Sequence, residues 1–226
     1  MALRNFNQPM KLPMRVWDAP TRLFHWAITL LIVVSYVSVQ RNWMQIHLLS
    51  GYTVLTLLLF RLAWGFLGSD TSRFGKFLRS PFAGFRHLAQ FTRREPDTQV
   101  GHNAAGGWMV LLMLLLLGVQ AGTGLFSNDD GATEGPLAKH VSKATSDWLS
   151  GVHGTSFWVL VGVIVVHVVV VFLYAFVKKH DLIRPMFTGK KRLPAATRAP
   201  RMRSPALALA LLAASAAVVW VIASRA

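Results

Sequence analysis

Four of the eight histidines lie within, or at the ends of, long apolar segments. They are His25, His47, His153 and His167. Ionisable side chains at membrane depth are costly, so they usually have a function or face a polar interior. Any one of the four could equally be an ordinary interfacial histidine at the end of a helix. Imidazole nitrogens bind transition metals and haem iron, so the four together form a candidate ligand set.

The spacing of two of these residues strengthens the metal-binding interpretation. His153 and His167 are 14 positions apart, about four helical turns, so both project from nearly the same face of one helix. Their separation along the helix axis is about 21 Å. Two ligands at that separation can each serve a different haem, one near each membrane surface, and each haem then needs a second ligand from another helix.

Composition narrows the class of protein. The 226 residues are 53% hydrophobic and 15% charged, with a net charge of +15, which is unusual for a soluble globular domain. The aromatic residues are not interleaved with the basic ones and no nucleic-acid motif is present, so we expect no nucleic-acid partner. Cysteine is absent, which excludes iron–sulfur clusters and covalent c-type haem attachment. Any redox centre must then be held by histidine or methionine.

Five apolar segments approach or exceed the roughly 20 residues that a helix needs to cross a bilayer. They lie at residues 23–40, 46–67, 105–126, 150–177 and 205–223. We therefore predict an all-α integral membrane protein, a four-helix transmembrane di-haem bundle with a fifth C-terminal transmembrane helix. The expected division is an N-terminal segment 1–22, a haem-binding domain 23–180, a basic linker 181–204 and the last helix 205–226.

The distribution of Lys and Arg predicts the orientation. Nineteen of the 24 lie before the first helix, in the 68–104 loop or in the 178–204 linker, whereas four lie on the other side. The positive-inside rule then places the N-terminus and both of these segments in the cytoplasm. The 127–148 loop and the C-terminus would face the periplasm, if the membrane is a bacterial inner membrane.

Helix direction predicts how the histidines pair. The second and fourth helices run from outside to inside, which places His47 and His153 near the outer surface. The first helix runs the other way, so His25 lies in the inner half with His167. The inner pair matches less well in depth, because His25 lies three residues from the nearest basic residue and His167 eleven. A longer fourth helix, or a first helix that begins earlier, would reconcile the two.

Two further polar residues are candidate contacts of the inner haem. Arg61 lies 14 positions after His47, on the same helix face, where a haem propionate would be a suitable counter-charge. Snorkelling to the cytoplasmic interface is an equal alternative. His102, in a Gly-His-Asn segment before the third helix, could ligate the inner haem or contact its propionate. His87 and His180 lie in basic segments and are expected to be solvated.

An ordered set of motifs resembles the prokaryotic cytochrome b561 family, which includes the b-type cytochrome subunits of nickel–iron hydrogenases. The motifs are VWDAPTRLFHW at 16–26, HLLSGY at 47–52, RLAWG at 61–65, GHN at 101–103, and the histidines at 153 and 167. The resemblance covers roughly residues 14–180. It implies two b-type haems with His25, His47, His153 and His167 at the ligand positions, and electron exchange with the quinone pool. Ala104 and Gly154 depart from the family pattern, which leaves the subfamily and the electron donor open.

We therefore expect a di-haem b-type cytochrome that transfers electrons between an extracytoplasmic c-type cytochrome or hydrogenase and membrane quinone. One alternative is a self-contained superoxide:quinone oxidoreductase. That activity needs a basic funnel to the outer haem, for which Lys139, His140 and Lys143 are the only candidates, and four acidic neighbours oppose it. A histidine-lined metal or proton transporter is less favoured, because the sequence shows neither internal repeats nor broken helices.

Overall fold

Five long helices dominate the computed structural model, which describes residues 10–90, 93, 96–131 and 133–225. They are α1 (Ala19–Gln40), α2 (Met44–Leu67), α5 (Ala104–Gly124), α6 (Lys143–Leu173) and α8 (Pro205–Ala223). Each is long and apolar enough to cross a membrane. The predicted all-helical, multi-pass membrane fold is confirmed.

Two helices begin earlier than predicted because polar residues cap their N-termini. Asp18 accepts a hydrogen bond from the Thr21 backbone N–H at 2.7 Å, and Pro20 fills an early position where a missing N–H costs nothing. α1 therefore begins four residues before the predicted start. Ser142 caps α6 in the same way, so this helix begins seven residues early. Both extensions are polar or mixed segments that a search for apolar stretches does not include.

Short elements connect the long helices. They are β1 (Lys11–Arg15), α3 (Phe74–Phe77), α4 (Pro81–Ala89), the 3-10 turn η1 (Ala138–His140), the π-helical turn η2 (Tyr174–Lys178), α7 (Ile183–Thr188) and β2 (Lys190–Pro194). β1 and β2 pair antiparallel, with Lys11 opposite Pro194 and Arg15 opposite Lys190. This small sheet was not predicted, and it ties the N-terminal segment to the linker.

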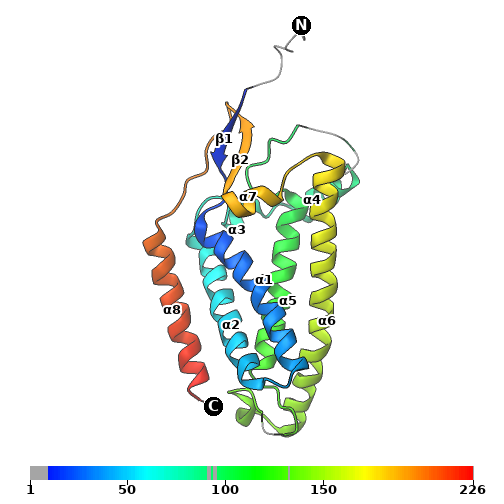
Figure 1. Cartoon of the computed structure of the whole chain (residues 1–226), viewed down its shortest axis with the longest axis vertical. Helices are drawn as coiled ribbons and strands as arrows, with labels where there is room; N and C mark the ends of the chain where they lie inside the picture. The colour runs from blue at the N-terminus through cyan, green and yellow to red at the C-terminus, as the bar shows by residue number, and fades with distance from the viewer. Residues whose placement is uncertain (1–9, 91–92, 94–95, 132, 226) are drawn as a thin grey trace.

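Figure 1 shows α1, α2, α5 and α6 side by side as a bundle, with α8 against the outer side of α2. One end of the bundle carries β1, β2, α4 and α7, and we call it the sheet end. The opposite end carries the α5–α6 connection and the C-terminus, and we call it the loop end. The two ends therefore differ in chemistry, because most of the basic connecting segments gather at the sheet end.

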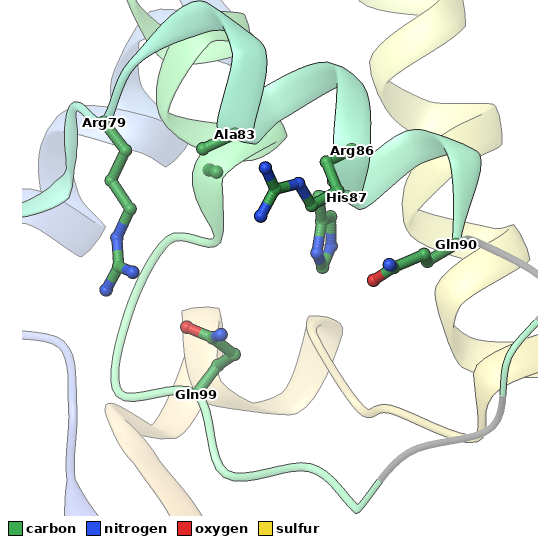
Figure 2. Close-up of a pocket in the computed structure, with 7 residues that line it drawn as sticks. Arg79, Ala83, Arg86, His87, Gln90 and Gln99 are labelled. Carbon is green, nitrogen blue, oxygen red and sulfur yellow. The ribbon is translucent and has the colours of Figure 1, made fainter.

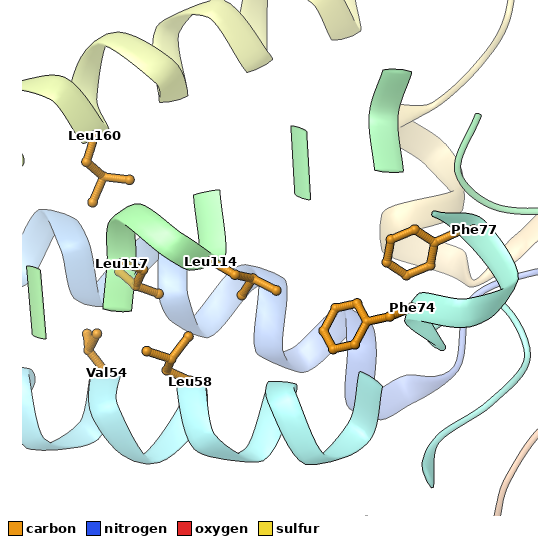
Figure 3. Packing of buried hydrophobic residues seen from close by; sticks show 7 residues of the cluster. All are labelled: Val54, Leu58, Phe74, Phe77, Leu114, Leu117 and Leu160. Carbon is orange, nitrogen blue, oxygen red and sulfur yellow. The ribbon is translucent and has the colours of Figure 1, made fainter. Parts of the chain in front are cut away.

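The apolar core of the bundle lies between its two ends. Figure 3 shows its buried members, which are Val54, Leu58, Phe74, Phe77, Leu114, Leu117 and Leu160. Leu160 is only 2% exposed and lies seven positions from each of the two histidines of α6. A packed hydrocarbon layer therefore separates the histidine at one end of α6 from the histidine at the other.

The last helix is held by its linker as well as by packing. Asp70, just after α2, exchanges two hydrogen bonds of 3.0 Å with the backbone of Arg201. The Arg203 backbone N–H donates to Ser69 Oγ, also at 3.0 Å. Ala208 then packs against Phe60 and Trp64 of α2. These contacts dock α8 on the bundle although it carries no histidine.

Candidate functional site

Helices α1, α2 and α6 bring the four membrane histidines together in two pairs. At the loop end, the ring centres of His47 from α2 and His153 from α6 are 6.0 Å apart. At the sheet end, those of His25 from α1 and His167 from α6 are 6.4 Å apart. The residues that lie together are the ones that helix direction places at the same depth.

The separation within each pair fits a shared metal. An imidazole nitrogen binds a transition metal at about 2 Å and lies about 1 Å from the centre of its own ring, so two such rings on opposite sides of one metal have centres about 6 Å apart. Direct hydrogen bonding between two rings would bring them closer. The ring-centre distances of 6.0 and 6.4 Å in the two pairs match this separation.

Backbone carbonyl groups orient the rings of the loop-end pair. His47 Nδ1 lies 3.2 Å from the Ser35 carbonyl oxygen, and His153 Nδ1 lies 2.9 Å from the Gln120 carbonyl oxygen. A carbonyl only accepts, so each Nδ1 donates its proton, and a metal would be bound through Nε2. Ring orientation by a carbonyl acceptor is typical of metal-binding histidines.

A close approach of α5 to α6 also fixes His153. A Cβ added at Gly124 would lie 2.9 Å from His153 Cε1 and 3.2 Å from Nδ1. The side chain of Gln120 contacts the same ring, with its Nε2 3.2 Å from His153 Nε2, and its Oε1 accepts from Ser156 at 2.6 Å. The imidazole of His153 is therefore positioned by α5 on more than one side.

The sheet-end pair has fewer partners. His25 Nδ1 is buried without a hydrogen-bond partner in the described part of the chain, and the His25 ring meets Trp26 edge to face at 4.9 Å. The early start of α1 places His25 in the second turn, which removes the mismatch in depth that the predicted helix bounds had suggested. No hydrogen bond to either ring of this pair is found within the described residues, so helix packing positions it.

Open space lies beside the histidines. A Cβ added at Gly51, one turn after His47, or at Gly154, next to His153, would meet no atom within 4 Å. The same holds at Gly162, between the two histidines of α6. Gly154 and Gly162 are exposed, so the space at these two positions faces the outside of the bundle, whereas Gly51 is half-buried and is where a planar group beside His47 would find room.

Arg61 is buried near the sheet-end pair. It is 3% exposed, its guanidinium lies over the Phe74 ring at 5.1 Å, and its Nη1 has no hydrogen-bond partner among the described residues. This burial rules out snorkelling to solvent. A buried guanidinium with an unpaired N–H is a site for an anionic oxygen such as that of a propionate.

His102 belongs to neither pair. Its ring lies between those of Trp17 and Phe77, at 4.7 and 4.8 Å, and its Nδ1 is buried without a partner in the described residues. Burial, followed by the positive charge of Arg61, lowers the pKa of His102 to about 3. The imidazole is therefore neutral at pH 7 and lines the surroundings of the sheet-end pair.

Sequence reasoning misjudged one histidine. His87 was expected to be solvated, but its Nε2 lies 2.7 Å from the Tyr174 hydroxyl, which also accepts from Asn103 Nδ2 at 3.0 Å. These contacts connect α4, α5 and the π-helical turn that follows α6. The expectation considered only the basic neighbours of His87 in sequence, whereas its partner lies 87 positions away.

The fold and its paired histidines define a multi-pass helical membrane protein with one candidate metal-binding pair at each end of a single bundle. Residues 16–189 match the family model of prokaryotic cytochrome b561, and the chain belongs to this family. It is therefore a b-type cytochrome, a haem-binding protein that transfers electrons in a membrane. Searches of curated proteins and of solved structures find no match to the chain.

Proposed function

We propose that the protein holds two b-type haems, one between His47 and His153 and the other between His25 and His167. The observation that supports this most strongly is the ring separation of 6.0 and 6.4 Å in two pairs at opposite ends of one bundle. Haem bound there would supply a reversible one-electron couple at its iron. The chain supplies ligands, spacing and a water-free surrounding.

The residues around each pair have separate roles in this proposal. The carbonyl groups of Gln120 and Ser35 would hold the protons of the loop-end imidazoles on Nδ1, and haem binding would use Nε2, which on His153 requires the Gln120 side-chain amide, now 3.2 Å away, to give up its contact. Arg61 offers its unpaired Nη1 to a propionate of the inner haem, and neutral His102 contacts the same region without acting as a ligand. Leu160 and its neighbours exclude water between the two pairs.

We infer an inner-membrane location, with the sheet end in the cytoplasm and the loop end and C-terminus in the periplasm. The excess of Lys and Arg in the sheet-end segments supports this orientation. Residues 23–180 form the haem-binding domain in this proposal, flanked by 1–22, 181–204 and 205–226. A periplasmic c-type cytochrome or hydrogenase would exchange electrons with the protein at the loop end, and membrane quinone would be the second electron-transfer partner.

The exposed surface of the loop end bears on the alternative functions. Lys143 forms ion pairs with both Asp130 and Asp147, and the other exposed basic groups at this end are Arg41, Lys139, His140 and Arg225. Such a surface favours docking of a protein with charges of both signs over attraction of a small anion such as superoxide. A metal transporter would need a cluster of metal ligands, and no group of three or more His, Asp or Glu residues forms one within the described residues.

Haem stoichiometry and single-ligand variants test the proposal. We expect two haems per polypeptide in a pyridine haemochrome assay. His47→Ala and His153→Ala should remove the same low-spin component in low-temperature spectra, and His25→Ala and His167→Ala the other. His102→Ala serves as the control and should retain both haems. One haem per chain, or a colourless protein that binds a divalent metal, would contradict the proposal.

A further inference from the structure

A basic cavity lies at the sheet end, apart from both histidine pairs. Its volume is about 180 Å³, and its lining includes Arg79, Ala83, Arg86, His87, Gln90 and Gln99. Figure 2 shows the side chains of Arg79, Arg86, His87, Gln90 and Gln99 directed toward one shared space. No acidic side chain among the described residues lines this space, so the groups that line it give it a positive character.

Helix α4 forms one wall of the cavity because of its residue spacing. Ala83, Arg86, His87 and Gln90 recur at intervals of three and four positions, so they share one helix face. The helix is braced against α5, since Trp108 Nε1 donates to the Arg79 carbonyl oxygen at 3.0 Å. The bond of His87 to Tyr174 braces it against the end of α6. The wall is therefore formed in advance of any ligand.

Arginine makes the cavity suited to phosphate. The guanidinium groups of Arg79 and Arg86 make no hydrogen bond or ion pair with a described residue, and Arg86 only stacks on Phe82 at 5.1 Å. A guanidinium presents a planar fork of donors that matches two oxygens of a phosphate. The amides of Gln90 and Gln99 add neutral donors around the same space.

The position of the cavity points to a lipid as the source of that phosphate. Phe82 and Phe85 of α4 are 67% and 71% exposed, and Trp108 beside them is 37% exposed. Tryptophan is enriched at the level of the lipid headgroups, and phenylalanine is found on the apolar face of helices that lie in the membrane surface. A short helix with apolar rings and cations together is typical of an element that lies in the membrane surface. The arginines of the cavity are thus at headgroup depth.

We propose that this cavity binds the phosphate of an anionic phospholipid, with Phe82 and Phe85 against its acyl chains. Basic pockets at helix ends are suited to such headgroups because anionic lipids attract cations at the membrane surface. The bound lipid would join α4 to the ends of α5 and α6. Free phosphate offers the same oxygens but no acyl chain, so the two sources are separable by experiment.

Native mass spectrometry of the full-length holoprotein, reconstituted with either phosphatidylglycerol or phosphatidylcholine, tests the proposal. The wild type should retain one phosphatidylglycerol in preference to phosphatidylcholine. Arg79→Gln with Arg86→Gln should weaken retention roughly 100-fold, at about tenfold for each lost charge-assisted contact. Arg184→Gln with Arg198→Gln removes the same charge from exposed residues elsewhere and should leave retention unchanged.

A second variant distinguishes the contribution of the space in the cavity from that of its positive charge. Ala83→Leu fills the space while keeping both arginines, and it should also release the lipid. Absorbance of the haems establishes that each variant is folded. Equal loss in the two double variants would overturn the proposal, because general surface charge would then explain binding. Binding of inorganic phosphate with no preference for phosphatidylglycerol would likewise overturn the lipid assignment.

Discussion

Replacing Gly124 by alanine should disturb the loop-end histidine pair, and the haem proposed to bind there, without disturbing the sheet-end pair. The added Cβ would lie 2.9 Å from His153 Cε1, whereas ordinary contacts of this kind begin near 3.4 Å. The ring must therefore move by about 0.5 Å, and this motion strains the 2.9 Å bond from Nδ1 to the Gln120 carbonyl. Overpacking of this kind costs about 1–3 kcal/mol.

The assay is electron paramagnetic resonance of the oxidised protein together with redox titration. Because ring orientation and hydrogen bonding of an axial histidine tune a haem, we expect a shifted low-spin signal and potential for one haem and no change for the other. Gly122→Ala is the matched control, since a Cβ at Gly122 meets nothing within 4 Å. Both substitutions bring the same gain in helix propensity, about 1 kcal/mol at most. Any difference between the two variants in signal or potential therefore comes from the contact with His153. Identical spectra for the two variants would refute the reasoning.

Two further predictions concern the sheet end. Gly65→Ala places a Cβ 2.0 Å from the Phe74 ring and should lower the free energy of unfolding by about 1–3 kcal/mol in thermal denaturation, while Gly75→Ala, whose Cβ meets nothing, should not. The pKa of Asp70 is lowered, first by the hydrogen bond from the Arg201 N–H and then by nearby cations. The stabilisation that ionised Asp70 gives the linker is therefore complete above the ordinary aspartate pKa of about 3.9. It is lost as the pH falls through the lowered pKa. The protection factor for hydrogen exchange at the Arg201 amide, which corrects for the intrinsic pH dependence of exchange, should fall over that acidic range in the wild type and stay constant in Asp70→Asn; a constant wild-type protection factor would contradict this.

The transmembrane helices could be predicted from the sequence because bilayer thickness fixes the length of an apolar segment. The starts of α1 and α6 could not be predicted in this way, since the caps Asp18 and Ser142 extend the helices through polar residues. The β1–β2 sheet was missed for a different reason. Its strands are short, largely exposed and far apart in sequence, so no local pattern marks their pairing.

The candidate site could be anticipated in part. Helix direction placed His47 with His153 and His25 with His167. The reason is that successive helices cross the bilayer in alternating directions, so the position of a residue along its helix gives its depth. The groups that orient the loop-end rings were not predictable, since they are backbone carbonyls that any residue carries. The contact of His87 with Tyr174 depends on how α4 folds back, which no spacing in the sequence encodes.

Asp18 connects the start of α1 to the end of α2, and its removal should loosen the region that positions His25. Its carboxylate accepts from the Thr21 N–H at 2.7 Å and from Trp64 Nε1 at 3.1 Å, and Trp64 is fully buried. Asp18→Ala therefore loses a helix cap, about 1 kcal/mol, and removes the acceptor of two buried donors, the Trp64 indole N–H and the Ser72 hydroxyl at 3.3 Å, a further 1–3 kcal/mol or so. We expect a loss of about 2–4 kcal/mol in the free energy of unfolding measured in detergent.

A matched cap separates the two contributions to this loss. Ser204 caps α8 through the Ala206 N–H and has no second partner of the Trp64 kind, so Ser204→Ala should cost only the capping energy, about 1 kcal/mol. Asp18→Asn keeps an acceptor oxygen and should fall between these values. If Asp18→Ala and Ser204→Ala are equally destabilising, the bond to Trp64 contributes nothing, and the early start of α1 rests on its cap alone.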